Sequence, residues 1–116
     1  MKVLIVEQEK TLQQSLHYFM QHQKNFEVEL AHSQKEGLSL GQSSPFDVVL
    51  CADRLPDGSG LEMLKTLIRQ SPAIVSILMT ARHDDILKQE TMQAGIQGYL
   101  EKPFDLQQLE EAMGLK

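Results

Sequence analysis

The sequence is poor in cysteine, tryptophan and basic residues. A single Cys and no Trp occur in 116 residues; one cysteine excludes an internal disulfide framework and fits a reducing compartment. Lys and Arg together number 11 against 16 Asp and Glu, which gives a net charge of −5 and argues against nucleic-acid binding by this domain. Apolar runs stay far below the roughly 20 residues of a membrane helix, and we expect no signal peptide. We therefore expect a cytoplasmic domain that contacts neither nucleic acid nor membrane.

Short apolar runs alternate with amphipathic stretches along the whole chain. The runs predict buried strands at 2–6, 28–31, 47–51, 73–79 and 97–100. Capping residues and helix breakers predict helices at 9–22, 33–41, 59–71, 84–95 and 105–113. Ser33 and Glu36 have the spacing of a capping box, and Gly41 is expected to end the helix that they open.

Five strand–helix units define the expected fold. Such units favour a parallel sheet covered by helices on both faces, and right-handed crossovers leave a doubly wound, three-layer α/β sandwich. We expect one domain over residues 1–116, with a five-stranded sheet of order 2-1-3-4-5 and a functional crevice at the carboxyl ends of the strands. The strand ends that border this crevice carry Glu7-Gln8-Glu9, Ala52-Asp53, Thr80-Ala81 and Lys102-Pro103.

Four segments at these strand ends resemble the receiver domain of two-component response regulators. They are Val-Leu-Ile-Val-Glu-Gln-Glu at 3–9, Leu-Pro-Asp-Gly-Ser-Gly-Leu-Glu at 55–62, Met-Thr-Ala at 79–81 and Gly-Tyr-Leu-Glu-Lys-Pro-Phe at 98–104. The resemblance covers essentially the whole chain and implies a flavodoxin-like (βα)5 fold. In that family a partner histidine passes a phosphoryl group to an aspartate after strand 3, and an acidic pair after strand 1 helps to hold Mg²⁺. The resemblance thus implies a signalling module rather than an enzyme.

Three residues match the family's phosphate-binding and switch positions. By resemblance, Thr80 is the switch hydroxyl, Lys102 is the lysine that binds the acyl phosphate, and Tyr99 is the aromatic switch position. Pro103 matches the proline after that lysine, whose peptide bond is often cis. The resemblance also implies a protein partner, which is a sensor kinase, an output domain, another regulator or a second copy in a homodimer. Such domains usually meet partners through the surface that residues 84–113 form here.

Two positions depart from the family pattern. The family's phosphoacceptor lies four residues before the proline of the Leu-Pro turn, which is Pro56 here, so Ala52 stands in its place. The second acidic position after strand 1 is Gln8, and only Glu7 remains of the acidic pair. A methyl group has no oxygen to phosphorylate, so we predict a pseudo-receiver without a cofactor, in which Mg²⁺ binds weakly at most, through Glu7. In this hypothesis an ion pair between Glu7 and Lys102, the only opposite charges expected in the crevice, replaces the metal.

Two other interpretations stay open. In the first, Asp53 accepts the phosphoryl group, although side-chain alternation along a strand predicts that Ala52 and Asp53 do not both point into the crevice. The simpler interpretation of Asp53 is a polar residue that opens the loop. The second interpretation is a flavodoxin-like small-molecule binder, although Glu7-Gln8-Glu9 occupies the place of a Ser/Thr/Gly-rich phosphate loop. Glu9 is interpreted as a cap of the first helix rather than a metal ligand, and Cys51 as a small buried residue.

Overall fold

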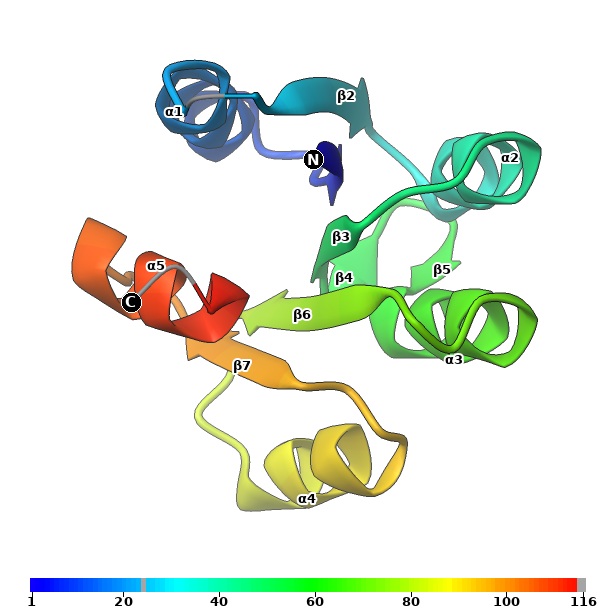
Figure 1. Cartoon of the computed structure of the whole chain (residues 1–116). Helices are drawn as coiled ribbons and strands as arrows, with labels where there is room; N and C mark the ends of the chain where they lie inside the picture. Colours follow the sequence, from blue (N-terminus) through cyan, green and yellow to red (C-terminus); the bar gives the residue numbers. More distant parts are fainter. Residues whose placement is uncertain (24, 115–116) are drawn as a thin grey trace.

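A parallel sheet forms the centre of the molecule (Figure 1). The computed structural model describes residues 1–23 and 25–114. The strands of the sheet are β1 (Lys2–Val6), β2 (Glu27–Ala31), β3 (Val48–Ala52), β6 (Val75–Thr80) and β7 (Gly98–Glu101), and a separate hairpin joins β4 (Arg54–Leu55) to β5 (Gly58–Ser59). The observed order β2-β1-β3-β6-β7 confirms the predicted order 2-1-3-4-5, because the hairpin, which the sequence analysis did not predict, only shifts the numbering.

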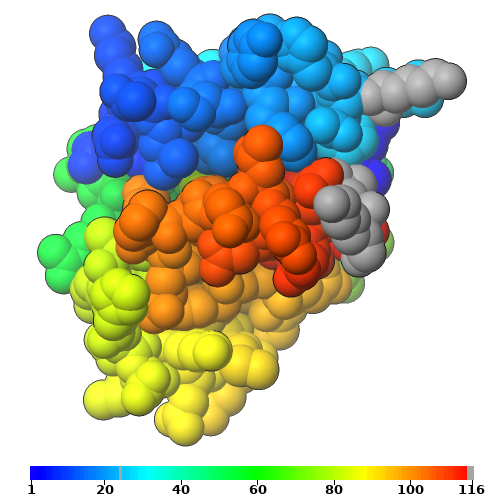
Figure 2. All heavy atoms as spheres, turned by 90° about the vertical axis from the view of Figure 1, so that its left-hand side faces the viewer, coloured from blue at the N-terminus to red at the C-terminus, as the bar shows by residue number. Residues whose placement is uncertain are grey.

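Helices cover both faces of the sheet (Figure 1). On one face lie α1 (Lys10–Gln21) and α5 (Leu106–Met113), and on the other lie α2 (Gln34–Ser43), α3 (Gly60–Gln70) and α4 (Asp85–Gln93). Figure 2 looks onto the first face, where α1 and α5 are neighbours. The predicted three-layer sandwich is therefore confirmed. Along the described residues, none of the helices has the length and apolar character needed to cross a membrane.

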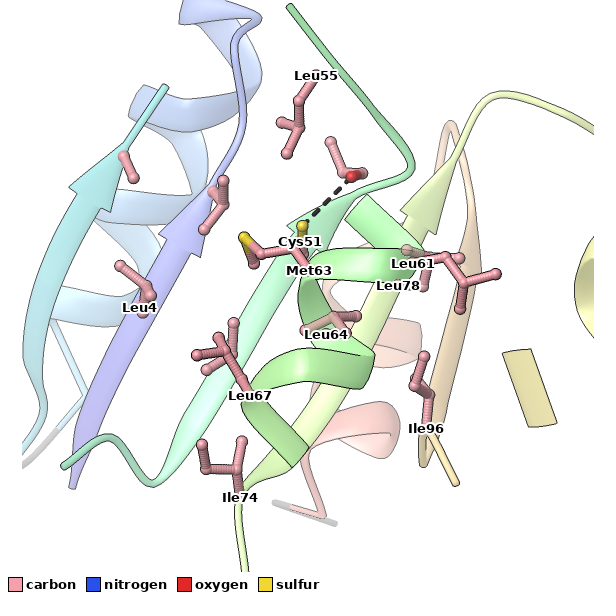
Figure 3. Packing of buried hydrophobic residues seen from close by; sticks show 14 of the residues in the cluster. Leu4, Cys51, Leu55, Leu61, Met63, Leu64, Leu67, Ile74, Leu78 and Ile96 are labelled. Atoms are coloured by element: carbon pink, nitrogen blue, oxygen red, sulfur yellow. Dashed lines mark hydrogen bonds between the residues drawn. The ribbon is translucent and has the colours of Figure 1, made fainter. Parts of the chain in front are cut away.

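Side chains of the sheet alternate between two cores. Val48 and Leu50 of β3 pack toward α1 and α5, whereas Val49 and Cys51 pack toward α2, α3 and α4. Figure 3 shows the second cluster, in which α3 lies over the strands. All of β3 is buried, as expected for a central strand with helices on both sides. Burial raises the pKa of the Cys51 thiol, which keeps it protonated and unreactive.

Helix α2 begins after Ser33, as predicted, but its capping box is incomplete and its end lies beyond Gly41. Gly41 does not end the helix, which continues beyond it. A Cβ atom on Gly41 would lie 2.8 Å from Cδ2 of Leu67, so this glycine lets α2 and α3 pack closely. At the other end, the Ser33 side chain accepts a hydrogen bond from the backbone N–H of Glu36. The Glu36 carboxylate, however, accepts the backbone N–H of His32 at 2.6 Å and does not complete the predicted capping box.

A second cap of α2 comes from the β4–β5 hairpin. The Asp57 carboxylate accepts hydrogen bonds from the backbone N–H of Gln34 at 2.7 Å and of Lys35 at 2.9 Å. These bonds lower the pKa of Asp57 from its usual value, and the bond from Lys35 has the largest effect. The contact joins residues 22 and 23 positions apart, so no local sequence pattern signals it.

Candidate functional site

A cavity of about 230 Å³ opens at the carboxyl ends of the central strands and is lined by residues 7–9, 52–54, 79–82 and Lys102. Because parallel strands end at the same edge of a sheet, residues far apart in the sequence meet there. The strand ends that the sequence analysis selected after β1, β3, β6 and β7 are thus brought together. The Lys102–Pro103 peptide bond beside the cavity is cis, as the resemblance implies.

Glu7 and Lys102 form an ion pair at the cavity. The Lys102 ammonium lies 2.7 Å from Oε1 of Glu7, and Oε2 accepts the backbone N–H of Glu9 at 3.0 Å. The Glu7 side chain is only 2% exposed, so its charge depends on these partners for compensation. The predicted pair is therefore present. Glu9 holds the N-cap position of α1, as predicted, but its side chain makes no cap hydrogen bond.

Ala52 ends β3 and lines the cavity. The backbone around it is tightly enclosed, because a Cβ atom on Gly60 would come within 1.8 Å of the Ala52 carbonyl oxygen. This close approach requires glycine at the start of α3. The position to which the resemblance assigns the phosphoacceptor therefore carries an alanine in a firmly held backbone.

Asp53 also lines the cavity, and the prediction that it does not share the cavity with Ala52 is wrong. Its side chain is 6% exposed. Oδ2 accepts hydrogen bonds from the Thr80 hydroxyl at 3.2 Å and from Nε of Arg82 at 2.9 Å, while Oδ1 accepts from Nη2 of Arg82 at 3.1 Å. The alternation rule fails here because β3 ends at Ala52 and the chain bends at Asp53, so both residues line the cavity over the strand end.

Arg82 lines the candidate site but was not predicted from the sequence. It lies in the loop after β6 and forms a two-bond pair with Asp53, the strongest ion-pair geometry available to a carboxylate. The hydrogen bond to Asp53 raises the pKa of the Arg82 guanidinium. Its position two residues after Thr80, at the end of a predicted strand, is the feature of the sequence that could have placed Arg82 at the crevice. The expectation that Glu7 and Lys102 are the only opposite charges in the crevice is corrected accordingly.

The lining of the cavity is balanced in charge. Three acidic side chains meet three basic ones, namely Glu7, Glu9 and Asp53 against Arg54, Arg82 and Lys102. Both buried carboxylates among them have a cation partner within hydrogen-bond distance. The cavity therefore carries little net field to attract either a cation or an anion.

The two predicted switch residues lie in different surroundings. Thr80 is 1% exposed, and its hydroxyl both donates to Asp53 and accepts the backbone N–H of Arg82 at 3.0 Å. Tyr99 packs against the core on the α3 side and does not line the cavity. Its hydroxyl is buried and has no hydrogen-bond partner among the described residues, and burial raises its pKa. The structure thus brings Thr80, but not Tyr99, to the charged groups that line the cavity; the Tyr99 ring instead faces the Lys88 ammonium, 5.9 Å from its centroid.

The residues present do not fit a Mg²⁺ ion. Mg²⁺ requires oxygen ligands, principally carboxylates, and the two buried carboxylates already bind Lys102 and Arg82. Gln8 and Ala52 supply no charge at the two remaining family positions. Within residues 1–23 and 25–114, no group of three or more His, Cys, Asp or Glu side chains is placed to hold a metal ion.

The fold and the strand-end residues together define a class of protein. A five-stranded sheet of this order, with a threonine and a lysine at the carboxyl ends of β6 and β7, is the architecture of a signalling receiver domain. A sequence model of the response regulator receiver domain matches residues 3–114, and the chain belongs to this family. It is the receiver domain of a two-component response regulator.

Known relatives agree with this assignment. The chain is similar to the response regulator ArlR of Staphylococcus saprophyticus, with 33% identity over 108 residues that cover 93% of the chain and 48% of ArlR. The chain therefore spans about half the length of the curated relatives it matches. Among solved structures, a response regulator receiver domain protein from Clostridium thermocellum superimposes with a TM-score of 0.88 at 28% identity, over 98% of this chain and 91% of that one. Chemotaxis protein CheY4 of Vibrio cholerae gives a TM-score of 0.86 at 28% identity, over 98% and 96%.

Proposed function

We propose that this domain is a pseudo-receiver, which acts through protein–protein contacts and is not phosphorylated at the position that the family uses. The observation that carries this proposal is Ala52, whose methyl group stands where the phosphoacceptor aspartate is expected. An aliphatic carbon cannot attack a phosphoryl group. The proposal also places the protein in the cytoplasm, where two-component signalling domains meet their partners.

The paired charges of the cavity support this proposal. In a phosphoacceptor site, clustered carboxylates repel one another and a divalent cation relieves the repulsion. Here the Glu7–Lys102 and Asp53–Arg82 pairs neutralise the carboxylates without a metal. Lys102, to which the resemblance assigns the acyl phosphate, is held at 2.7 Å by Glu7. A phosphoryl group would have to displace this carboxylate.

Asp53 as a substitute phosphoacceptor is the second candidate. The observation in its favour is that its carboxylate lines the cavity and contacts Thr80. Against it, both carboxylate oxygens accept hydrogen bonds from Arg82, and a carboxylate held in this way is a weaker nucleophile. A small-molecule site has less support still, because the volume of about 230 Å³ lies below the usual range of ligand pockets.

The surface over residues 84–113 is proposed to bind the protein partner. Ile86 and Met92 of α4 are 69% and 64% exposed, and apolar side chains left in water by a folded domain favour a binding surface. We propose a sensor kinase, an output domain or another regulator as the partner. A second copy of the chain in a homodimer is the alternative that a mass measurement in solution distinguishes.

Treatment with acetyl phosphate and Mg²⁺ tests the proposed function. We expect intact-mass spectrometry to find no phosphorylated wild-type protein, and NMR amide shifts at Thr80 and Lys102 to stay unchanged with beryllofluoride. A mass increase of one phosphoryl group that disappears in Asp53→Asn would instead establish the second candidate. Labelling that persists in Asp53→Asn would contradict both.

A further inference from the structure

The β6–α4 loop is joined to the end of β3 by a continuous polar network. Asp53, which follows β3, binds both the Thr80 hydroxyl and the Arg82 guanidinium. Arg82 in turn donates its backbone N–H to the Thr80 hydroxyl at 3.0 Å. Each of the three residues therefore contacts the other two, which leaves the loop little freedom to move independently of the sheet.

The network continues to the first turn of α4. Nη1 of Arg82 lies 3.9 Å from Oδ2 of Asp84. Asp84 is the N-cap of α4, and its Oδ1 accepts the backbone N–H groups of Ile86 at 2.9 Å and Leu87 at 3.2 Å. The carboxylate that caps α4 is thus adjacent to the guanidinium that Asp53 holds, so Arg82 alone separates Asp53 from the cap of α4.

Burial makes this network costly to break. The Asp53 side chain is 6% exposed, whereas that of Arg82 is 39% exposed. If the guanidinium moved into solvent, a buried carboxylate would lose its charged partner, and such a loss is strongly unfavourable. Separation of Arg82 from Asp53 is therefore costly for as long as Asp53 stays buried.

We propose that Asp53 is a built-in anionic ligand that holds Thr80 and Arg82 in place and thereby fixes the β6–α4 loop and the first turn of α4 in one conformation. No event in the cavity is then needed to order this part of the molecule. The statement that α4 is presented to a partner in this fixed position rests on the proposed function. The contacts of Asp53 with Thr80 and Arg82, here called the clamp, do not rest on it, because they lie within the chain.

Hydrogen–deuterium exchange at the backbone amides of Arg82, Ile86 and Leu87 tests the clamp. Arg82→Met keeps much of the side-chain volume but removes every donor, and Asp53→Asn removes the charge without changing the shape. We expect each variant to speed exchange at these amides about tenfold relative to amides of β1. The double variant should add little, because the two residues act as a unit.

Arg54→Met is the matched control. Arg54 lines the same cavity, is exposed, and makes no side-chain hydrogen bond or ion pair in the part of the chain that the structure describes. Unchanged exchange in Arg82→Met, or an equal increase in Arg54→Met, would overturn the clamp. If Asp53→Asn does not fold, the comparison of Arg82→Met with Arg54→Met still tests whether the clamp exists. A phosphorylated wild type would overturn the proposed function while leaving this result intact.

Discussion

The hydroxyl of Thr80 donates a hydrogen bond to the carboxylate of Asp53 across 3.2 Å, and thereby joins the ends of β3 and β6. These strands are neighbours in the sheet. Asp53 is adjacent in the sequence to Ala52, so a buried carboxylate directly follows the alanine that ends β3. The cavity therefore has an acidic group beside Thr80, and this group also binds Arg82.

Ala52→Asp combined with Gln8→Asp should restore a metal site. The two new carboxylates join Glu7 at the cavity and supply the oxygen ligands that Mg²⁺ requires. At about ten times its dissociation constant, Mg²⁺ should stabilise the double variant by about 1.4 kcal/mol, which raises the melting temperature by about 5 °C. Thermal unfolding curves with and without Mg²⁺ measure this shift in melting temperature.

The neutral variant Ala52→Asn with Gln8→Asn is the control for shape. It should show no response to Mg²⁺, and neither should the wild type. A double aspartate variant that folds but neither responds to Mg²⁺ nor accepts phosphate from acetyl phosphate would mean that position 52 does not correspond to the family's acceptor.

Lys102→Met should destabilise the fold by about 2 kcal/mol, because Glu7 would remain buried without its cation. The cost stays below that of a fully buried pair because Lys102 is 21% exposed. Water can therefore reach this place and hydrate part of the carboxylate that is left unpaired. Glu7→Gln combined with Lys102→Met should recover part of the loss. Urea unfolding of the two single variants and the double variant gives the coupling energy, and a coupling near zero would show that the pair does not stabilise the native state.

Gly60→Ala should cost about 3 kcal/mol, because its Cβ would lie 1.8 Å from the Ala52 carbonyl oxygen and backbone atoms cannot move aside easily. Gly58→Ala is the comparison, since the three atoms nearest to its Cβ would all belong to the Gln34 side chain, the first at 2.6 Å. That side chain can rotate away. Equal unfolding free energies for the two variants would argue against the close backbone packing at the start of α3.

Asp57→Ala should lower the melting temperature at pH 7 and have a smaller effect in acid. The pKa of Asp57 is lowered from its ordinary value, chiefly by the hydrogen bond from the backbone N–H of Lys35. A carboxyl whose pKa is depressed by folding stabilises the native state above its unfolded pKa, and this contribution disappears as the pH falls through the folded pKa. Melting curves between pH 7 and pH 2 measure the difference.

Ser33→Ala is the control for the pH dependence. It removes the other cap of α2, the bond to the Glu36 N–H, but a hydroxyl does not titrate in this range. Its destabilisation should therefore not fade with acid as that of Asp57→Ala does. If the two variants follow the same pH profile, the Asp57 charge is not the source of the effect.

The strands and their order could be predicted because they follow from local apolar runs. The predicted strand 47–51 is observed at Val48–Ala52, a shift of one residue, and crossover handedness then restricts the topology. Helix ends with a short-range signal were also predicted: Asp105 forms a capping box with Gln108, and Gly95 after α4 has a φ of 85°. Each of these signals lies within a few residues of the structure that it determines.

The parts that could not be predicted depend on contacts between distant residues. Asp53 binds Arg82, 29 residues away, and nothing in either local sequence identifies the other as its partner. Side-chain alternation holds within a strand, whereas Asp53 lies just beyond the end of β3. Glycine is typical of helix ends, but Gly41 lies inside α2, where it allows close packing against Leu67.

The parallel arrangement also separates the ends of the described chain from the cavity. Met1 precedes β1 and donates its ammonium hydrogen to the Asn25 carbonyl, and Ala112, near the end of α5, lies beside Gly98 at the start of β7. Both ends are therefore at the amino-terminal edge of the sheet, about 17 Å, or one strand length, from the cavity. A fluorescent dye or an affinity tag attached at either end would leave the cavity mouth unobstructed, so surface immobilisation and spectroscopic labelling can be done without altering the site under study.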